Sequence, residues 1–487
     1  MDLDPQHCYR AVLARDARFD GRFFSGVVTT GIYCRPICPV HPPKFENIRW
    51  YACAAAAEAA GFRPCRRCRP ETAPGTPAWM GSAAVVSRAL RLITAGAFEE
   101  DDVEGLATRL GLGARQLRRV FAQHLGASPA QVARSRRIHF ARRLLDDTQL
   151  SMTRIAFNAG FRSVRQFNHA MRQCFGAAPS ELRRRTKRPQ TAGSALVVRL
   201  PFRPPLDWAA VLGFLAARAT PGIEHVEGNC YRRSIALNDA RGIIEVAPVP
   251  EQRYLRMSVD LSCDTDLFQA VERARRLFDL DADPSRIDEQ LQRSSILKPL
   301  VDATPGLRVP GTWDGFELAV RAVLGQQVSV RGATTLAGRL VQAFGQALQE
   351  PRETITHLFP TPESLTAADL TTIGLPRARA TTIRDLAIEV AAGRLQLDSA
   401  LGLDEAVGRL RAVRGIGEWT AQYIAMRALG EPDAFPAGDL GLRRALANGA
   451  GPLSSKQIAE IAESWRPWRS YATMRLWTHL SQNEVKR

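Results

Sequence analysis

Two short stretches decide the fold of the N-terminal region: Tyr33-Cys34-Arg35-Pro36-Ile37-Cys38 and Pro64-Cys65-Arg66-Arg67-Cys68. Each stretch carries a pair of cysteines, and 26 residues separate the two pairs. Two closely spaced thiol pairs can close around one Zn²⁺ ion as a tetrahedral site with four cysteine ligands. The spacing fits a purely structural zinc knot. It also fits a zinc thiolate that acts as a nucleophile, because a metal-bound thiol is already deprotonated.

The residues around these cysteines favour the second interpretation. The chain runs Asp20-Gly-Arg-Phe-Phe-Ser-Gly-Val-Val-Thr-Thr-Gly-Ile-Tyr before the first pair and Ala60-Gly-Phe-Arg-Pro before the second. Over residues 5–72 this pattern resembles the N-terminal domain of the Ada DNA-repair proteins. The resemblance implies that Cys34 takes a methyl group from a methyl phosphotriester in DNA, and that Cys38, Cys65 and Cys68 are the remaining zinc ligands. Five nearby arginines are expected to grip DNA phosphates: Arg35, Arg63, Arg66, Arg67 and Arg69.

Positive charge is concentrated in the first two-fifths of the chain. Residues 1–190 hold 31 Lys and Arg against 15 Asp and Glu, whereas residues 191–487 hold 35 against 34. This concentration indicates a polyanionic partner. The 487 residues are 45% hydrophobic and 24% charged, which suits three or four globular domains. With no signal peptide, no apolar run of membrane-spanning length and only nine cysteines, we expect a cytoplasmic protein with no membrane partner.

An internal repeat with an offset of 50 residues lies within this basic segment. Gln116-Leu117 and Gly126-Ala-Ser-Pro129 return as Gln166-Phe167 and Gly176-Ala-Ala-Pro179. Each unit predicts two short helices around a glycine turn. The helices are expected over 103–110 and 114–125, then over 152–159 and 163–175, with a joining helix near 130–146.

A helical bundle with solvated arginines would give the same local pattern. The duplication, however, resembles the paired helix-turn-helix domain of AraC-type transcription regulators. That resemblance implies two helices placed in the major groove of promoter DNA. The side chains expected to contact DNA are Arg115, Gln116, Arg118, Arg165, Gln166 and Asn168.

The C-terminal half carries a second pair of motifs. Leu410-Arg-Ala-Val-Arg-Gly415-Ile416-Gly417-Glu-Trp419 predicts a helix, a Gly-x-Gly turn and a second helix, whose N-terminus can receive a phosphate. Asp439 follows the loop Phe435-Pro-Ala-Gly438, and by itself it would be interpreted as a helix cap. Together the motifs resemble the helix-hairpin-helix, Gly/Pro-rich loop, Asp superfamily of DNA glycosylases. Residues 195–480 are most similar to its AlkA type of 3-methyladenine glycosylase.

This resemblance implies how the site works. An N-alkylated purine is a good leaving group, and a carboxylate such as Asp439 can stabilise the positive charge that its departure creates on the sugar. The base must first be flipped out of the duplex. The resemblance assigns Trp419, Tyr423 and Trp477 to the base pocket, where electron-rich rings suit a cationic base. By composition alone these aromatic residues would be ordinary helix-packing residues.

Four positions of these motifs make the prediction more specific. Gly415 and Gly417 are expected to contact the DNA backbone. Gln327 stands where the AlkA type carries a leucine wedge, which puts lesion preference in doubt. The lyases of the superfamily carry a nucleophilic lysine two residues after the second hairpin glycine, where this chain has Trp419. We therefore expect a monofunctional glycosylase that forms no Schiff base.

The sequence thus predicts a multidomain protein that is mainly α-helical with α+β parts. The expected units are a Zn(Cys)4 domain (1–76), a double helix-turn-helix domain (83–186), an α+β subdomain (195–305) and a helix-hairpin-helix domain (306–487). Expected cofactors are one Zn²⁺ and a monovalent cation at the helix-hairpin-helix. Expected partners are alkylated and promoter double-stranded DNA and RNA polymerase, and we expect a monomer.

These units predict an alkylation sensor joined to a repair enzyme. Methyl transfer to Cys34 would be coupled to transcription activation, because losing one thiolate charge weakens the repulsion of DNA phosphate. The glycosylase would excise alkylated bases such as 3-methyladenine. Two alternatives remain open: a glycosylase with a structural zinc knot and a non-regulatory DNA-binding domain, or a regulator with an inactive glycosylase half. No Pro-Cys-His-Arg nucleophile of an O6-alkylguanine transferase is present, so we expect Cys230 and Cys263 to be ordinary residues.

Overall fold

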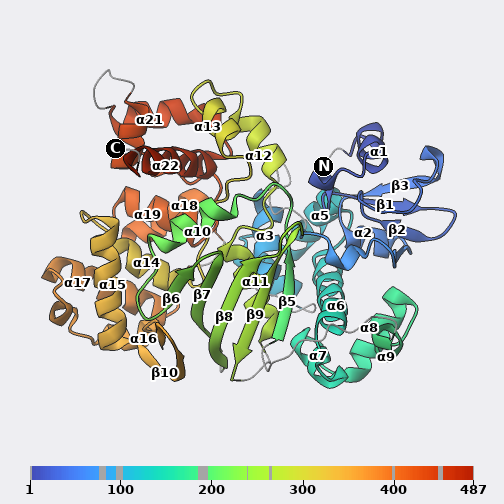
Figure 1. Cartoon of the computed structure of the whole chain (residues 1–487), viewed down its shortest axis with the longest axis horizontal. Helices are drawn as coiled ribbons and strands as arrows, with labels where there is room; N and C mark the ends of the chain where they lie inside the picture. The colour runs from blue at the N-terminus through green and yellow to red at the C-terminus, as the bar shows by residue number, and fades with distance from the viewer. Residues whose placement is uncertain are drawn as a thin grey trace.

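The computed structural model describes residues 3–75, 84–94, 102–184, 196–238, 240–262, 266–397, 401–447 and 453–485. An antiparallel sheet occupies the centre of the molecule (Figure 1). The N-terminal elements lie to its right in that view, and the helical C-terminal half lies to its left. Within the described ranges, no helix is both long and apolar enough to cross a membrane.

The first unit is a small sheet with strand order β3-β1-β2-β4 and short flanking helices. Strands β2 and β4 run parallel, with Tyr33 beside Pro64, so Cys34 and Cys65 follow at the same end of neighbouring strands. The topology therefore brings the two cysteine pairs together. Its elements are α1 (Pro5–Leu13), β1 (Phe24–Val27), β2 (Ile32–Cys34), β3 (Ile48–Tyr51), α2 (Ala54–Ala59) and β4 (Arg63–Pro64).

The second unit contains every helix that the internal repeat predicts, with ends shifted by only a few residues. Gly111 and Gly160 sit at the two turns with φ values of 70° and 77°, a conformation that glycine adopts without the steric cost of a Cβ. The helices are α3 (Ala84–Thr94), α4 (Val103–Arg109), α5 (Ala114–Leu125), α6 (Pro129–Asp147), α7 (Met152–Asn158), α8 (Val164–Phe175) and α9 (Pro179–Arg184).

The third unit is the predicted α+β part, an antiparallel sheet of order β5-β9-β8-β7-β6 with helices packed on it. Buried and exposed residues alternate along much of β9, which is the period-2 pattern of a half-buried strand. Its elements are β5 (Leu196–Pro201), α10 (Trp208–Ala216), β6 (Glu224–Glu227), β7 (Cys230–Leu237), β8 (Ala240–Pro248), β9 (Tyr254–Leu261) and α11 (Leu267–Leu277).

One hydrophobic core joins the second helix-turn-helix unit to this sheet. Phe140, fully buried on α6, meets Phe268 on α11 edge to face, with ring centroids 5.0 Å apart. Phe167 on α8 and Met257 on β9 belong to the same core. The second helix-turn-helix unit and the sheet therefore share a packed interior.

The fourth unit is helical, as predicted, except at one place. The helix-hairpin-helix domain expected over 306–487 also contains a hairpin of β10 and β11, which the sequence does not indicate. Almost every residue of β10 is exposed, so the strand leaves no apolar alternation in the sequence. Helices α12 (Pro284–Leu291) and α13 (Lys298–Ala303) lead into this unit. Its elements are α14 (Gly315–Leu324), α15 (Val330–Phe344), β10 (Gln346–Arg352), β11 (Ile355–Leu358), α16 (Pro362–Thr366), α17 (Arg377–Ala391), α18 (Leu403–Ala412), α19 (Glu418–Arg427), α20 (Leu440–Leu446), α21 (Ser455–Ala462) and α22 (Arg469–Val485).

Candidate functional site

A carboxylate held between two indole rings is the centre of the C-terminal site. Asp439 is the N-cap of α20, and its Oδ1 accepts the backbone N–H of Leu442 at 3.0 Å. The indole N–H of Trp477 donates to Oδ1 at 2.9 Å, and that of Trp419 donates to Oδ2 at 2.9 Å. Both carboxylate oxygens are thereby fixed in direction. Asp439 therefore caps α20 and also presents its carboxylate to the site, so both interpretations of this residue hold together.

The three aromatic residues assigned to the base pocket lie together around this carboxylate. Trp419 and Tyr423, one turn apart on α19, stack with ring centroids 5.4 Å apart and an interplanar angle of 8°. Trp477 from α22 lies 6.2 Å from Tyr423 at 49°. All three rings remain partly exposed, so they are not simply core residues.

Sequence analysis missed the arginines beneath these rings. Arg427 donates to the Tyr423 hydroxyl at 2.9 Å, and its guanidinium lies 4.6 Å from the centroid of the Phe214 ring. Arg218 covers the same Phe214 ring at 3.8 Å. Burial would raise the pKa of Tyr423, but the nearby guanidinium groups of Arg427, Arg218 and Arg321 outweigh it and lower that pKa. Only the i, i+4 spacing of Tyr423 and Arg427 could have signalled this contact.

An exposed apolar residue also escaped sequence analysis. Leu440 directly follows Asp439 and is 66% exposed. A large apolar side chain so open to solvent contributes little to the core, so its place beside the carboxylate makes it a candidate contact for DNA.

The predicted hairpin connects α18 to α19 and requires glycine at its first position. Gly415 has a φ of 87°, and a Cβ there would lie 2.0 Å from Oγ1 of Thr382. Gly417 is the N-cap of α19 and borders open space. The Gln326 amide donates to the Gly415 carbonyl at 3.0 Å and to Thr420 Oγ1 at 3.1 Å. The next residue, Gln327, is exposed with a φ of 56°, so the predicted wedge is anchored to the hairpin.

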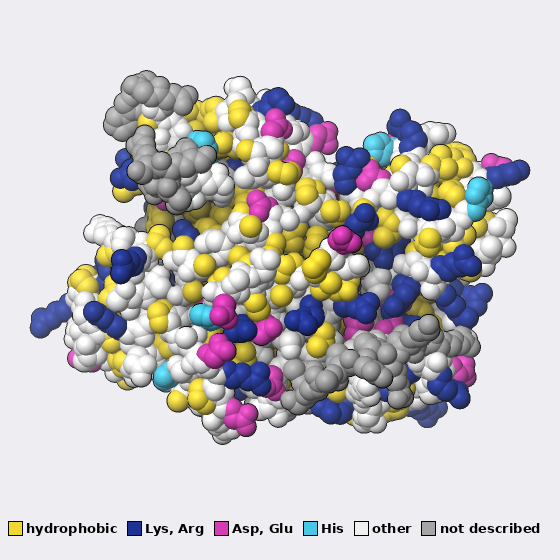
Figure 2. All heavy atoms as spheres, viewed as in Figure 1, with side chains coloured by type: hydrophobic (Ala, Val, Ile, Leu, Met, Phe, Trp, Pro, Cys, Tyr) yellow, Lys and Arg dark blue, Asp and Glu magenta, His cyan; other side chains and the backbone are white. Residues whose placement is uncertain are grey.

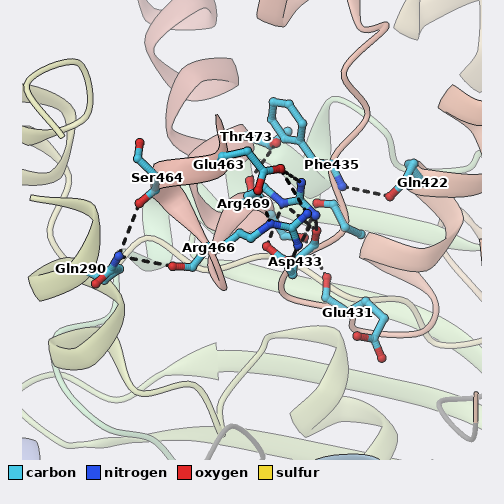
Figure 3. A network of polar contacts seen from close by, with 12 residues as sticks. Gln290, Gln422, Glu431, Asp433, Phe435, Glu463, Ser464, Arg466, Arg469 and Thr473 are labelled. Carbon is cyan, nitrogen blue, oxygen red and sulfur yellow. Dashed lines mark hydrogen bonds and ion pairs between the residues drawn. The ribbon is translucent and has the colours of Figure 1, made fainter. Parts of the chain in front are cut away.

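The loop that leads to Asp439 is clamped from α22 (Figure 3). The Arg469 guanidinium donates from Nε to Asp433 Oδ1 at 2.8 Å and from Nη2 to Oδ2 at 3.0 Å. The Phe435 N–H donates to the side-chain oxygen of Gln422 on α19, at 3.0 Å. Because Trp477 is also on α22, this helix positions both the loop and the carboxylate.

The N-terminal site is a cluster of four cysteine sulfurs that all lie within 4.8 Å of one another. Cys38, Cys65 and Cys68 are buried, whereas Cys34 is partly exposed. A set of four sulfurs at this separation fits a Zn²⁺ ion.

The arginines near this cluster differ in direction. The Arg35 side chain points inward, and it donates to Asp20 Oδ1 at 2.8 Å, the Cys68 carbonyl at 3.0 Å and Thr72 Oγ1 at 2.7 Å. This placement argues against the predicted phosphate contact of Arg35 and favours a role in holding the cysteine loops together. Arg67, in contrast, is exposed.

The predicted recognition residues lie on the outward face of their helices. Arg115, Gln116 and Arg118 are exposed on α5, and Arg118 pairs with Glu104 at 3.1 Å. On α8, Arg165 and Gln166 are exposed and Asn168 is half-buried. The Gln166 side-chain oxygen accepts the backbone N–H of Arg162 at 3.1 Å, so this side chain also caps its own helix.

A buried polar cluster links the cysteine domain to the second helix-turn-helix unit. The Tyr33 hydroxyl, next to Cys34, donates to Glu58 Oε1 at 2.8 Å. His139 Nε2 on α6 contacts the same oxygen at 2.8 Å, and the Cys174 thiol on α8 lies 3.7 Å from it. Burial would raise the pKa of Glu58, but His139 and these hydrogen bonds lower it below the usual value. Glu58 therefore connects three elements through one carboxylate oxygen.

Comparison with known families divides the chain into four matched regions. Residues 7–71 match the metal-binding domain of Ada, and residues 106–185 match a helix-turn-helix domain. Residues 197–314 match the AlkA N-terminal domain, and residues 320–469 match the HhH-GPD superfamily of base excision DNA repair proteins. The regions follow one another in the order that the sequence predicts.

Three individual proteins extend this result. The chain is 45% identical to a probable bifunctional transcriptional activator/DNA repair enzyme AlkA of Mycobacterium tuberculosis, over 99% of this chain and 97% of that protein. It is 36% identical to DNA-3-methyladenine glycosylase 2 of Escherichia coli, over 57% of this chain and 95% of the relative. The solved 3-methyladenine DNA-glycosylase of Archaeoglobus fulgidus matches 57% of this chain and 96% of its own, with 26% identity and a TM-score of 0.51.

Proposed function

The chain belongs to the family of bifunctional transcriptional activator/DNA repair enzymes, and on that premise we propose that it senses methylated DNA through Cys34 and excises alkylated bases at Asp439. The observation that carries the proposal is the Asp439 carboxylate, which two indole N–H groups hold beside a partly exposed aromatic pocket. The four functional units correspond to residues 1–76, 83–186, 195–305 and 306–487.

In the glycosylase reaction, the flipped base enters the pocket of Trp419, Tyr423 and Trp477 and stacks on electron-rich rings. As the bond between sugar and base breaks, positive charge develops on the sugar. Asp439 stabilises that charge and orients the attacking water. Trp419 and Trp477 keep the carboxylate aimed, so each acts on the base and on the catalytic group. Gly415 and Gly417 let the hairpin approach a DNA phosphate, and Gln327 enters the gap left by the flipped base.

The proposed enzyme is monofunctional. The position of the lyase lysine is Trp419, whose indole is committed to Asp439, so no amine can form a Schiff base there. The product is an abasic site. Strand cleavage by purified protein that matched base release in rate, without heat or alkali, would contradict this.

In the sensor reaction, the Cys34 sulfur attacks the methyl carbon of a DNA methyl phosphotriester. A sulfur–carbon bond forms, the carbon–oxygen bond breaks, and the phosphodiester anion leaves with the electron pair. Zn²⁺, held by Cys34, Cys38, Cys65 and Cys68, would keep the attacking sulfur deprotonated. Cys34 is the partly exposed residue of the four, whereas Cys38, Cys65 and Cys68 are buried, and this supports its choice as acceptor.

Methylation then changes DNA affinity. The thioether formed at Cys34 carries no charge, so the N-terminal surface repels phosphate less than before. Arg67 assists phosphate binding. Arg115, Gln116, Arg118, Arg165, Gln166 and Asn168 contact promoter DNA from α5 and α8. The proposal extends to a monovalent cation at the hairpin, to RNA polymerase as a partner of the DNA-bound activator, and to a monomer.

The variant Asp439→Asn tests the glycosylase. We expect base release from methylated DNA to fall by about a hundredfold or more, because a charged stabiliser of the transition state is lost, while DNA binding persists. Trp477→Phe, which keeps a ring but removes one N–H donor, should give a smaller loss. The exposed Asp404→Asn on α18 is the matched control. Undiminished base release in Asp439→Asn would remove Asp439 from the mechanism.

Mass spectrometry after incubation with methylated DNA tests the sensor. We expect one methyl group on Cys34, absent in Cys34→Ser and retained in Cys230→Ser. An unmodified Cys34 in folded, zinc-loaded protein would leave a structural knot attached to a glycosylase. Promoter affinity is then compared at one fixed salt concentration. Equal affinity of methylated and unmethylated protein would end the proposal of a switch.

A further inference from the structure

A cleft of about 460 Å³ lies where three parts of the chain meet. The cysteine domain contributes the segment around Cys68, α6 contributes Arg143 and Asp147, and the sheet contributes β5 and the turn before β9. On the face drawn in Figure 2, Lys and Arg side chains gather at the right, where the cysteine domain and α6 lie. Of the residues that line this cleft, only Arg67 and the zinc ligand Cys68 have a role in the functions proposed above.

The lining of the cleft carries more positive than negative charge. Its arginines are Arg35, Arg67, Arg69, Arg143, Arg199 and Arg253. Its acidic residues are Asp20, Asp147 and Glu251. The cleft therefore has six cationic side chains against three anionic ones.

Internal ion pairs account for only half of these arginines. Arg35 pairs with Asp20, Arg69 with Glu71 and Asp146, and Arg199 with Asp147 at 3.6 Å. Arg67, Arg143 and Arg253 have no ion pair within the described ranges. These three come from the cysteine domain, from α6 and from the turn before β9. Three guanidinium groups without an ion pair around one cleft give it a positive field that favours an anion.

Arg143 is the deepest of the three. Its Nε is buried and has no hydrogen-bond partner, and its guanidinium lies 5.4 Å from the Phe140 ring. Burial lowers its pKa to about 10; Arg275 adds repulsion, whereas the charges of Glu272 and Asp147 partly offset it, so the side chain stays charged at neutral pH. A charged donor in such surroundings is costly unless an anion or water satisfies it.

We propose that this cleft binds a phosphate group, with Arg143 at its base and Arg67 and Arg253 at its rim. The planar guanidinium fork matches the spacing of phosphate oxygens and donates two parallel hydrogen bonds. Because the three arginines come from different units, a bound phosphate ties the cysteine domain, the helix-turn-helix domain and the sheet to one another. The phosphate comes either from a DNA backbone or from a free phosphorylated molecule.

The first experiment uses the zinc-loaded full chain and inorganic phosphate. At constant ionic strength, replacing chloride by phosphate should raise the melting temperature of the wild type and should raise it less in Arg143→Gln. Arg67→Gln and Arg253→Gln change exposed side chains, so they report on the site even if Arg143→Gln folds poorly. The matched control is Arg293→Gln, which changes an exposed arginine just after α12 that does not line the cleft.

The second experiment separates the two phosphate sources. If the ligand is DNA backbone, Arg253→Gln should weaken duplex binding and lower the slope of log K against log salt by about one. If the ligand is a free molecule, phosphate should stabilise the wild type while duplex binding is equal in all variants. Both experiments use unmethylated protein and unmethylated duplex, so a failure of methyl transfer at Cys34 is distinguishable from a failure of this site. Wild-type behaviour of all three arginine variants in both experiments would overturn the proposal.

Discussion

The two helix-turn-helix units have helices of the same lengths but different neighbours. The helices α4 and α7 have seven residues each, and α5 and α8 have twelve. Both recognition helices end at a glycine with positive φ, 69° at Gly126 and 64° at Gly176. The core of the first unit includes Cys53 and Ala56 of the cysteine domain. The core of the second unit continues into the sheet. The first unit therefore packs on the cysteine domain and the second packs on the sheet, so the duplicated units connect these two parts of the molecule.

The cysteine domain touches both units, with different chemistry. Ala56 packs so closely on the first unit that a Cβ at Gly126 would lie 3.3 Å from the Ala56 Cβ. At the equivalent Gly176, the nearest atom is a guanidinium nitrogen of Arg63, also at 3.3 Å. The second contact is completed by the carboxylate of Glu58. Contact with the first unit is apolar and indifferent to pH, whereas contact with the second depends on charge.

The largest expected effect comes from removing a buried ring from one of the two cores, which should destabilise different helices and strands in each case. Phe140→Ala should lower the free energy of unfolding by about 3–5 kcal/mol, because a buried ring leaves a cavity. Hydrogen exchange should then accelerate in α7, α8 and the strands β5 and β9. Phe121→Ala, fully buried in the first unit, is the matched variant and should accelerate exchange in α4, α5 and α2.

The comparison fails if Phe140→Ala leaves exchange in β5 and β9 at the wild-type rate. In that case the second unit and the sheet would unfold independently despite their shared core. Equal spreading of exchange in the two variants would also contradict it, because the molecule would then behave as one cooperative unit.

Most of this architecture could be predicted from local signals. The glycine turns, the offset of 50 residues and the cysteine spacing act over a few residues each, and the helices of both units fall where the repeat places them. The pocket aromatic residues and Asp439 also come together as predicted. These features depend on short motifs whose chemistry is visible in the sequence.

Four other features could not be predicted in this way. Nothing in the sequence near Arg35 marks Asp20 as its partner, and nothing near Glu58 marks Cys174, because the chain distance exceeds any local pattern. The exposed hairpin of β10 leaves no apolar period. The arginines under Tyr423 look like surface charge until the fold buries them. Tertiary packing decides all four.

The charge of Glu58 makes the contact between the cysteine domain and the second unit sensitive to pH. The lowered pKa of Glu58 means that its stabilisation is complete above the usual value of 4.5 and is lost as pH falls through the folded value. Glu58→Gln should therefore cost about 1.5–3 kcal/mol at pH 6, the range for hydrogen bonds to a charged group. Its difference from the wild type should shrink at pH 4, as measured by urea unfolding.

Leu125→Ala, in the apolar core shared by the first unit and the cysteine domain, provides the control for this pH effect. Its difference from the wild type should be the same at both pH values, since no ionisable group is removed. Zinc content is measured in parallel, because acid also competes for the thiolates. If Leu125→Ala and Glu58→Gln respond alike to pH, the two contacts do not differ in the way described.

The smallest effect concerns the recognition helices themselves. Gln166 accepts the Arg162 N–H, whereas the side chain of Gln116 makes no hydrogen bond within the described ranges. Gln166→Ala should therefore lower the free energy of unfolding by about 0.5–1.5 kcal/mol, the worth of one such bond. Gln116→Ala should be within about 0.5 kcal/mol of the wild type, as for other surface substitutions.

Measuring promoter binding then shows whether Gln166 contacts DNA or only caps its helix. The variant Gln166→Glu keeps an oxygen that can accept the Arg162 N–H, but it loses the amide that would donate to a base edge. We expect it to retain stability and to lose promoter affinity, while Gln116→Ala loses affinity alone. Full promoter affinity in Gln166→Glu would make Gln166 a helix cap only. In that case Gln116 would contact bases from the first recognition helix, whereas Gln166, at the matching position of the second, would only cap its helix.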